Sequence, residues 1–411
     1  LPGRKDRTTK SLLLSSAVAA LLAMPGVAFA GDVVWWTPNW SQARAQKLAD
    51  EFHKANPDIN IKLQITTSNG LPQQVMTALQ SGSGPDIIEV QHGWVQGYAQ
   101  SDLVLPLDDT IQDKDDYNKA VIAEDTYNGQ LYAIPYRIEC TALIYNMDDY
   151  TKAGLDPANP PQTWDDWMAA SKKMTTDGVY GMAITGGGEF GNTITRALPL
   201  VWMNGGDIIS ADGKKAVINS PEAVAAIKFY TDFYTNKVSP DSTLQNDGVA
   251  NRQLFVAGKV ASYLTGQYDI APIAQAAPNL KIGAFMTPHP AGKQTAGILN
   301  GWSFVIPKDA QNPTDAKKFL QFLNTKENQG YFTDTFPARV SALDLPRFQD
   351  PNLKPFAGML PYGRPTPNTP HWVQISQAMF NGIQRILSGQ QDPQAAMDQA
   401  NDEIQALLDS D

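Results

Sequence analysis

The sequence contains a single cysteine, Cys140, among its 411 residues, which excludes an intramolecular disulfide bond. A cysteine nucleophile needs a base within reach, and no histidine lies near Cys140 in the sequence. A free cysteine without such a partner usually behaves as a small apolar side chain. We therefore interpret Cys140 as a buried packing residue.

Histidine and the usual catalytic motifs are also scarce. The four histidines are widely separated, and the chain has no C-x-x-C, no H-E-x-x-H and no G-x-S-x-G motif. We therefore expect no metal site, no cofactor and no nucleophile elbow. A pair of carboxylates acting as acid and base, as in glycosidases, stays open because Asp and Glu number 42.

No stretch of about 20 apolar residues occurs, so we expect no membrane-spanning helix. Four basic residues lie among the first ten, Arg4, Lys5, Arg7 and Lys10, followed by a short apolar run at residues 11–24 and the small-residue pattern Ala28-Phe29-Ala30. These features predict a secretory signal peptide over residues 1–30 and a mature chain that begins near Gly31. Cys140 is too far from that point to carry a lipid, so we expect an unanchored protein of the periplasm.

Positive charge is in short supply. Without residues 1–30 the chain has 28 Lys and Arg against 41 Asp and Glu, a net charge of −13. A protein that binds nucleic acid usually presents a basic surface to the phosphates. We expect no nucleic-acid partner, and we attribute the acidity to solubility.

Strand and helix patterns alternate three times near the N-terminus. Expected strands cover residues 32–36, 59–65 and 86–90, and each is followed by a helix with apolar residues at helical spacing. This order predicts a parallel, doubly wound α/β sheet. Ligands of such sheets bind at the carboxyl ends of the strands. The candidate binding residues there are Asn39, Trp40, Gly70, Gln91 and His92.

The stretch at residues 133–146 places two charged residues, Arg137 and Glu139, directly before an apolar strand at 142–145. Charged side chains are seldom buried unless they are paired. We interpret the stretch as a crossover between two lobes, with both side chains facing a cleft. Residues 280–285 are extended and are interpreted as a second crossover.

The second half repeats the α/β pattern. Thr163 and Asp166 form a capping box at the start of a helix at 164–174, and a strand is expected at 180–185. Gly186, Gly188 and Gly191 match G-x-G-x-x-G, but no strand-end acid follows at the spacing of a dinucleotide site. We interpret this loop, with Gly187, as a place where a ligand approaches the backbone. Two long helices, at 373–387 and 394–408, end the chain.

Two of the nine tryptophans lie in polar loops beside strands. Trp40 follows the first strand, and Trp302 comes directly after Gly301 and before a strand at 303–306. An aromatic face in such a loop suits the apolar face of a sugar ring, while polar neighbours bind the hydroxyl groups. We therefore place Trp40, Gly301 and Trp302 at a sugar site.

Several motifs in order resemble the extracellular solute-binding protein family 1, which includes maltose- and trehalose-binding proteins. They are PDIIEVQHGWVQGYAQSDLVLPLD, AIPYRIECTALIYNMDDYTKAGLDP, PPQTWDDW, FVAGKVASYLTGQYD, GWSFVIP, FPARV and RPTPNTP. The resemblance covers essentially the whole mature chain. It implies two α/β lobes around a hinge, with lobe one at residues 31–138 and 284–334 and lobe two at 139–283 and 335–411.

The resemblance also implies roles for single residues and a partner. Glu139 stands where these proteins use a carboxylate on sugar hydroxyls, and Arg137 lies beside it. Gln267 and Tyr268 match a loop that often carries a stacking tryptophan, Trp302 matches a stacking position, and Arg364 matches a sugar-binding arginine. The implied protein is a monomer that passes its sugar to the permease subunits of an ABC importer in the inner membrane.

Two other functions stay open. Arg137 and Arg364 could clamp an anionic ligand, such as a sugar derivative or a glycerol phosphate, although Glu139 can neutralise Arg137. A secreted glycoside-processing enzyme would instead need two carboxylates facing each other across the cleft.

Overall fold

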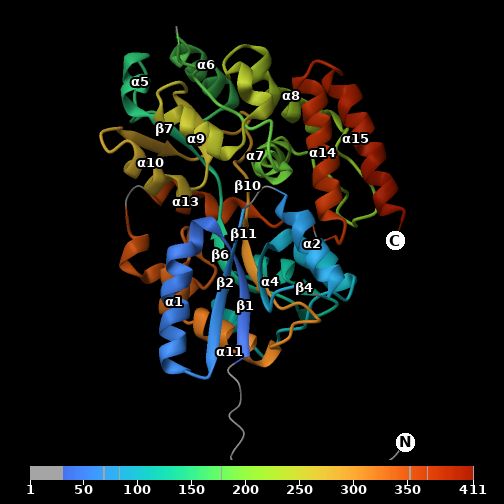
Figure 1. Cartoon of the computed structure of the whole chain (residues 1–411). Helices are drawn as coiled ribbons and strands as arrows, with labels where there is room; N and C mark the ends of the chain where they lie inside the picture. Colours follow the sequence, from blue (N-terminus) through green and yellow to red (C-terminus); the bar gives the residue numbers. More distant parts are fainter. Residues whose placement is uncertain are drawn as a thin grey trace, which may run out of the picture.

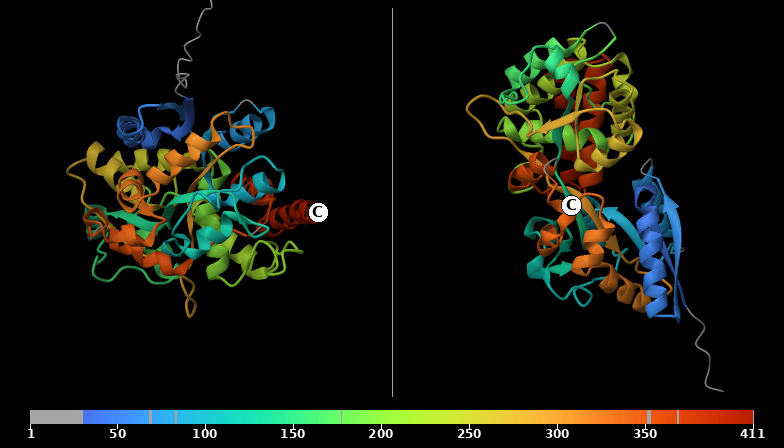
Figure 2. Two further views of the ribbon diagram at one scale, coloured as in Figure 1. Left: turned by 90° about the horizontal axis from the view of Figure 1, so that it is seen from below. Right: turned by 90° about the vertical axis from the view of Figure 1, so that its left-hand side faces the viewer.

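The computed structural model describes residues 31–67, 70–82, 84–176, 178–350, 353–367 and 369–410. The predicted signal peptide, residues 1–30, lies outside the described residues. Figures 1 and 2 show two lobes that are stacked end to end and joined by strands that pass through a waist. In the described part of the chain, no helix is long and apolar enough to cross a membrane.

The first lobe is built on a six-stranded sheet of order β12-β6-β11-β3-β1-β2. β1, β2 and β3 are parallel, as predicted, whereas β11 runs antiparallel to both β3 and β6, so the sheet is mixed. The strands are β1 (Gly31–Pro38), β2 (Ile59–Thr66), β3 (Ile87–Gln91), β6 (Ile134–Glu139), β11 (Asn300–Val305) and β12 (Phe336–Pro337).

The second lobe holds a smaller sheet of order β8-β7-β9, in which β7 pairs antiparallel with both neighbours. These strands are β7 (Ala142–Asn146), β8 (Ser262–Thr265) and β9 (Ile282–Phe285). Two short pairs complete the strands: β4 (Thr126–Tyr127) with β5 (Gln130–Leu131), and β10 (Gly297–Ile298) with β13 (Gly363–Arg364).

Helices cover both sheets (Figure 1). Those beside the first sheet are α1 (Gln42–Ala55), α2 (Leu71–Ser81), α3 (Val95–Gln100), α4 (Lys119–Glu124), α11 (Pro313–Leu323) and α12 (Lys326–Phe332). Those of the second lobe are α5 (Met147–Lys152), α6 (Trp164–Met174), α7 (Phe190–Met203), α8 (Pro221–Thr235), α9 (Gly248–Val256), α10 (Ile270–Ala276), α14 (Trp372–Leu387) and α15 (Pro393–Leu408). α13 (Lys354–Met359) packs near the waist, against β7 and β9.

The chain passes between the two sheets three times. The first passage is at residues 140–141, between β6 and β7, and it confirms the predicted crossover. The second passage lies at 286–299, because residues 282–285 form β9 and pair with β7; the expected crossover at 280–285 was therefore placed too early. The third runs from β12 to α14 through β13. The predicted lobe boundaries stay a prediction. β12 lies just beyond the predicted boundary at residue 335, on the side assigned to the second lobe, but it pairs with β6 of the first lobe.

Most predicted helices form where expected, and one predicted strand does not. The capping box of Thr163 and Asp166 is present with both of its hydrogen bonds. The last two helices begin one residue earlier than expected. Residues 180–185 do not form the expected strand and make only isolated parallel bridges, Tyr180 to Val260 and Ala183 to Tyr263.

Two apolar clusters make up the interior. The first packs Trp35, Phe52 and Phe304 between the six-stranded sheet and its helices. The second packs Trp167, Tyr230 and Ile375 among α6, α8 and α14. The first cluster also continues through the waist into the second lobe, where it includes Ile144 of β7, Tyr263 of β8 and Phe356 of α13.

Candidate functional site

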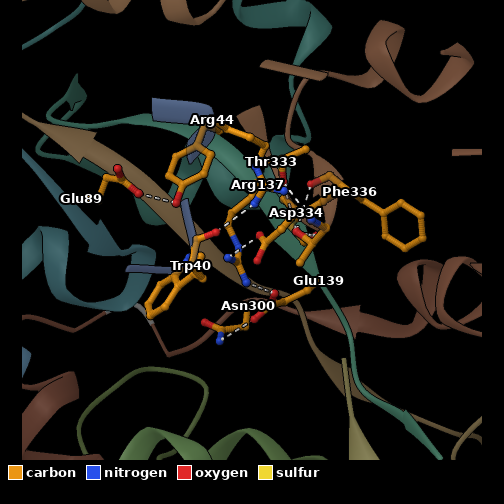
Figure 3. Close-up of polar contacts among 12 residues, drawn as sticks. Trp40, Arg44, Glu89, Arg137, Glu139, Asn300, Thr333, Asp334 and Phe336 are labelled. Atoms are coloured by element: carbon orange, nitrogen blue, oxygen red, sulfur yellow. Dashed lines mark hydrogen bonds and ion pairs between the residues drawn. The ribbon is translucent and has the colours of Figure 1, made fainter. Parts of the chain in front are cut away.

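Arg137 and Glu139 are the last charged residues of β6 before the chain crosses to the second lobe. Side chains two residues apart point to the same face of a strand, so the two can pair. Nη2 of Arg137 donates to Oε2 of Glu139, and Nη1 donates to Oδ1 of Asp334 at 2.7 Å (Figure 3). Arg137 and Glu139, which were predicted to lie in a crossover, therefore belong to the last residues of the buried strand β6.

These ion pairs hold a buried charge. The Arg137 side chain is 5% exposed, and those of Glu139 and Asp334 are 10% and 18% exposed. Burial opposes the charge, but the attraction of Asp334 and Glu139 outweighs it and raises the pKa of Arg137. One cation between two carboxylates leaves the cluster with a net negative charge. Asn300 of β11 approaches the other Glu139 oxygen, Oε1, at 3.5 Å.

Aromatic rings from both lobes flank the Arg137 guanidinium group. Its central carbon lies 6.0 Å from the ring of Trp40 and 6.0 Å from the ring of Tyr268. Trp40 belongs to the 3-10 turn η1 (Asn39–Ser41) after β1, whereas Tyr268 belongs to η5 (Gln267–Asp269) after β8. The Tyr268 hydroxyl accepts a hydrogen bond from buried Arg196 of α7 at 3.3 Å. Arg137 is therefore where the two lobes meet.

Trp302 lies behind Trp40 and takes a different role from the predicted one. Its ring packs edge-on against Trp40 at 5.2 Å and against Trp94 at 5.8 Å, and it is only 4% exposed. The prediction that Trp302 stacks on a ligand is therefore wrong, because Trp40 and Trp94 pack against it and leave it 4% exposed. Trp302 packs against Trp40, which is half-buried and whose ring lies 6.0 Å from the Arg137 guanidinium carbon.

His92, a predicted cleft residue, is buried in a hydrogen-bonded network. Its Nδ1 contacts the Ser303 hydroxyl at 2.7 Å and Asp125 at 3.2 Å, and its Nε2 faces the Arg137 carbonyl oxygen at 3.2 Å. Burial opposes the imidazolium, but Asp125 outweighs it and raises the pKa of His92. We correct the prediction: His92 positions the backbone of Arg137 and has no free nitrogen for a ligand.

Two predicted glycines also serve packing. A Cβ on Gly301 would lie 2.6 Å from Nε2 of His92 and would collide with the Arg137 carbonyl group, so only glycine fits there. A Cβ on Gly187 would lie 2.5 Å from the carbonyl carbon of Gln245. Gly187 is buried against that segment, so a ligand cannot approach its backbone as predicted.

The remaining predicted residues are spread over the two lobes. Asn39 and Gly70 are exposed beyond the ends of β1 and β2, and Gln91 pairs with Trp302 in the sheet. Gln267 is 4% exposed, and neither polar atom of its amide has a hydrogen-bond partner in the described structure. Arg364 lies apart from this group: it pairs with Asp207 at 2.8 Å and stacks 4.4 Å above the ring of Trp202.

Sequence reasoning missed Asp334, Asn300 and Arg44. Asp334 and Asn300 follow Arg137 and Glu139 by more than 150 positions, and only the sheet order brings them together. Arg44 lies in the first turn of α1, where its Nη2 donates to the Trp40 carbonyl oxygen at 3.3 Å. Its Nε is buried and lacks a partner among the described residues. The only sequence feature that could have indicated Arg44 is its position as a basic residue shortly after the first strand.

Within the described part of the chain, this group coincides with neither a metal-binding cluster nor the large cavity beside β12. Among the residues that the structure describes, no cluster of three or more His, Cys, Asp or Glu could hold a metal ion. A cavity of about 560 Å³ lies beside β12 and is lined mostly by apolar residues, among them Ile138, Phe336 and Leu353. None of the predicted site residues lines it, so the site rests on the Arg137 cluster.

Two α/β lobes joined by three passages, with a polar and aromatic cluster between them, define the periplasmic-binding-protein fold. The model of the family described as bacterial extracellular solute-binding protein matches residues 38–330. The chain belongs to this family. It is a solute-binding protein of the ABC-transporter class, and because members are transport receptors it is not an enzyme.

Similar proteins cover the chain almost fully. The sn-glycerol-3-phosphate-binding periplasmic protein of Shigella flexneri is 27% identical over 436 residues, with 96% of each chain covered. An ABC transporter solute-binding protein of Thermotoga lettingae, bound with α-D-tagatose, superposes with a TM-score of 0.85 at 25% identity and covers 92% of this chain and 99% of its own. A maltose-bound protein of T. maritima superposes at 0.82 with 22% identity, covering 92% and 99%.

Proposed function

We propose that the protein binds a neutral sugar between its lobes and delivers it to the permease of an ABC importer. We further propose that it does so as a monomer in the periplasm, after removal of residues 1–30 and without a lipid anchor. The main support is the cluster at Arg137, where a guanidinium group, two carboxylates and aromatic rings from both lobes come together.

Each part of the cluster has a use for a sugar. The half-buried ring of Trp40 and the ring of Tyr268 offer apolar faces to the CH groups of a sugar ring. Glu139 and Asp334 accept hydrogen bonds from hydroxyl groups, and a charged acceptor contributes about 1.5–3 kcal/mol per bond. Because Arg137 is already neutralised by two carboxylates, the cluster favours a neutral ligand over an anion.

An anionic ligand is the second candidate, and Arg44 is the observation that favours it. Arg44 has no carboxylate partner among the described residues and lies beside Trp40 at the same site. The similar protein of Shigella flexneri carries glycerol 3-phosphate in its name. A phosphate group would bind at Arg44 and would avoid Glu139, so the two candidates differ in which residue they need.

Binding is expected to shift a population of conformations. A sugar that first contacts Trp40 and Glu139 gains the groups of the second lobe, Tyr268 and Gln267, only when the lobes come together. A ligand shifts this equilibrium only as far as its contacts are better in the closed form. The closed form would then dock on the permease.

A binding screen tests the proposal. Thermal shift of the purified protein with neutral monosaccharides, oligosaccharides, polyols and sn-glycerol 3-phosphate identifies ligands, and calorimetry confirms them. We expect a neutral sugar to bind and Glu139→Gln to weaken it at least tenfold, with Arg44→Gln changing it little. If glycerol 3-phosphate binds instead and depends on Arg44, the second candidate replaces the first. If no compound binds, both are wrong.

A further inference from the structure

Three residues on the third passage between the lobes, Thr366, Pro370 and Trp372, contact the first lobe. Trp372 opens α14, which packs on α7, α8 and α15 of the second lobe. Its indole ring belongs to the second apolar cluster and is 5% exposed. Yet α14 also contacts η2 (His92–Trp94) of the first lobe. We call Thr366, Pro370 and Trp372 the latch residues.

Glu124 is the polar anchor of this contact. It is the last residue of α4, and its Oε1 accepts hydrogen bonds from the Thr366 backbone nitrogen at 2.8 Å and from the Thr366 hydroxyl group. Glu124 is 5% exposed and Thr366 is 8% exposed. The second oxygen, Oε2, is buried without a partner in the described structure. Opening the contact would bring this carboxyl group into water.

Two glycines of the first lobe make room for the latch residues. A Cβ on Gly93 would lie 2.6 Å from Nε1 of Trp372 and 3.0 Å from the Thr366 hydroxyl oxygen. A Cβ on Gly97 would lie 2.8 Å from the Pro370 carbonyl oxygen. Backbone approach this close is possible only without a side chain. The latch residues and the first lobe are therefore in close packing contact at Gly93 and Gly97.

We propose that the latch residues fasten the second lobe to the first and that the Glu124 carboxyl group controls how firmly they hold. The lobes then have a second determinant of their relative position besides the ligand site at Arg137. Loss of the Glu124–Thr366 contact frees the N-terminal end of α14 and widens the range of lobe positions.

The protonation of Glu124 gives the contact a pH dependence. Burial raises the pKa of Glu124 from 4.5 to about 7, against the opposing effects of His92 and of the Thr366 hydrogen bonds. When the Glu124–Thr366 contact is broken, the Glu124 carboxyl group lies in water and keeps its ordinary pKa. The carboxyl group therefore binds its proton more tightly while the contact is made. Protonation therefore favours the intact Glu124–Thr366 contact, whose population falls as pH rises from about 4.5 to about 7 and then levels off.

Other titratable groups surround Glu124, and their contributions to the pH dependence must be distinguished from that of Glu124. His92 of η2 and Asp125, the next residue, face it directly. Arg137 of β6 contributes a carbonyl group to His92, while its guanidinium is held by Glu139 and Asp334. Tyr127 lies on neighbouring β4, and His371 stands beside Trp372 on the latch side. Substitution of Glu124 alone isolates its part.

Distance measurement between the lobes tests the proposal without any ligand. Donor and acceptor dyes are placed at Lys54→Cys on α1 and Asp402→Cys on α15, both exposed, while Cys140 is buried and stays unlabelled. Energy transfer is followed from pH 5.5 to 8.5. We expect one narrow distance distribution at pH 5.5 and at least a fivefold larger open population at pH 8.5, with the increase levelling off above pH 7.

Three variants sharpen the result. Glu124→Gln imitates the protonated acid and should keep the narrow distribution at every pH, and Thr366→Val should broaden it at every pH. Thr77→Val, whose hydroxyl only donates to its own helix, should match the parent protein. The proposal is overturned if the parent shows no change with pH, if Glu124→Gln keeps the full pH dependence, or if Thr366→Val behaves as the parent. Circular dichroism verifies that each variant is folded.

Discussion

Arg137 donates a hydrogen bond of 2.7 Å to Asp334, a residue 197 positions further along the chain. Asp334 lies between α12 and β12, and β12 pairs with the strand that carries Arg137. The edge of the six-stranded sheet therefore supplies the second carboxylate of the site. Arg137 is fixed from two sides before a ligand arrives, which reduces the entropy that binding must overcome.

The two carboxylates around Arg137 should contribute to stability before they contribute to binding. Because each accepts one charged hydrogen bond, Glu139→Ala or Asp334→Ala should lower the free energy of unfolding by about 1–3 kcal/mol. The double variant leaves a buried charge without a partner and should cost about 3–5 kcal/mol. Urea unfolding measures all three.

An exposed ion pair provides the control for this series. Lys237 and Asp241 pair with side chains that are 72% and 77% exposed. Asp241→Ala should change the unfolding free energy by less than about 1 kcal/mol. Equal losses for Glu139→Ala and Asp241→Ala would mean that the Arg137 cluster is open to solvent.

Tyr268 should act through its ring more than through its hydroxyl group. Tyr268→Ala removes an aromatic face of the site and should weaken the binding of the sugar found by screening at least tenfold, about 1.4 kcal/mol. Tyr268→Phe loses only the contact with Arg196 and should weaken binding about twofold to threefold. Calorimetry compares both with Tyr234→Ala, which removes a ring near Lys237 on the second lobe. If that control weakens binding as much, the effect is not local.

Glu89 should make the protein less stable at alkaline pH. Burial raises the pKa of Glu89 from 4.5 to about 8, although its Oε2 accepts a 2.6 Å hydrogen bond from Tyr136. A raised carboxyl pKa favours folding below pH 4.5, and that benefit is lost as pH rises through 8. Glu89→Gln should be more stable than the parent at pH 8.5 by on the order of 3 kcal/mol.

Urea unfolding at several pH values separates Glu89 from two other acids. Burial also raises the pKa values of Glu124 and Glu189 to about 7, so their effects level off above that pH. Because the pKa of Glu89 is about 8, the difference in unfolding free energy between the parent and Glu89→Gln should still grow between pH 7 and 8. A constant difference across this interval would show that Glu89 ionises near its ordinary pKa.

Cys140 should be inert in the folded protein. It lies at the first passage between the lobes, is 1% exposed, and its thiol donates to the Ile298 carbonyl oxygen at 3.2 Å. Burial raises the pKa of this thiol, and the thiolate is the reactive form. A thiol reagent should react at least a hundredfold more slowly with native than with urea-unfolded protein. Equal rates would mean that the waist opens readily.

The sequence carried enough information for the framework of the fold. Alternating strand and helix patterns gave β1, β2 and β3 with their helices, since local periodicity decides these elements. The strand predicted at 180–185 was wrong, because a strand needs a partner along its length and this segment meets the β8 region only at two isolated bridges. The register of β11 against β6 and β3 could not be read from the chain, because it depends on contacts between distant segments.

The candidate site was predicted in part. Arg137, Glu139, Trp40 and Tyr268 do come together. Charged residues before an apolar strand indicated the first two, whereas Trp40 was chosen from its loop position and Tyr268 from the family resemblance. His92, Gly187, Gly301 and Trp302 were chosen as strand-end or loop residues, but packing covers them. Loop position in a sequence does not tell which side chains neighbouring elements will bury.

Calorimetry at low and at physiological ionic strength tests the central claim most directly. The titration compares the neutral sugar from the screen with sn-glycerol 3-phosphate on the same protein preparation. We predict that the sugar binds with the same affinity at both ionic strengths and that glycerol 3-phosphate does not bind, because Glu139 and Asp334 already neutralise Arg137. Binding of glycerol 3-phosphate that weakens steeply with salt, without binding of any neutral sugar, would contradict this account.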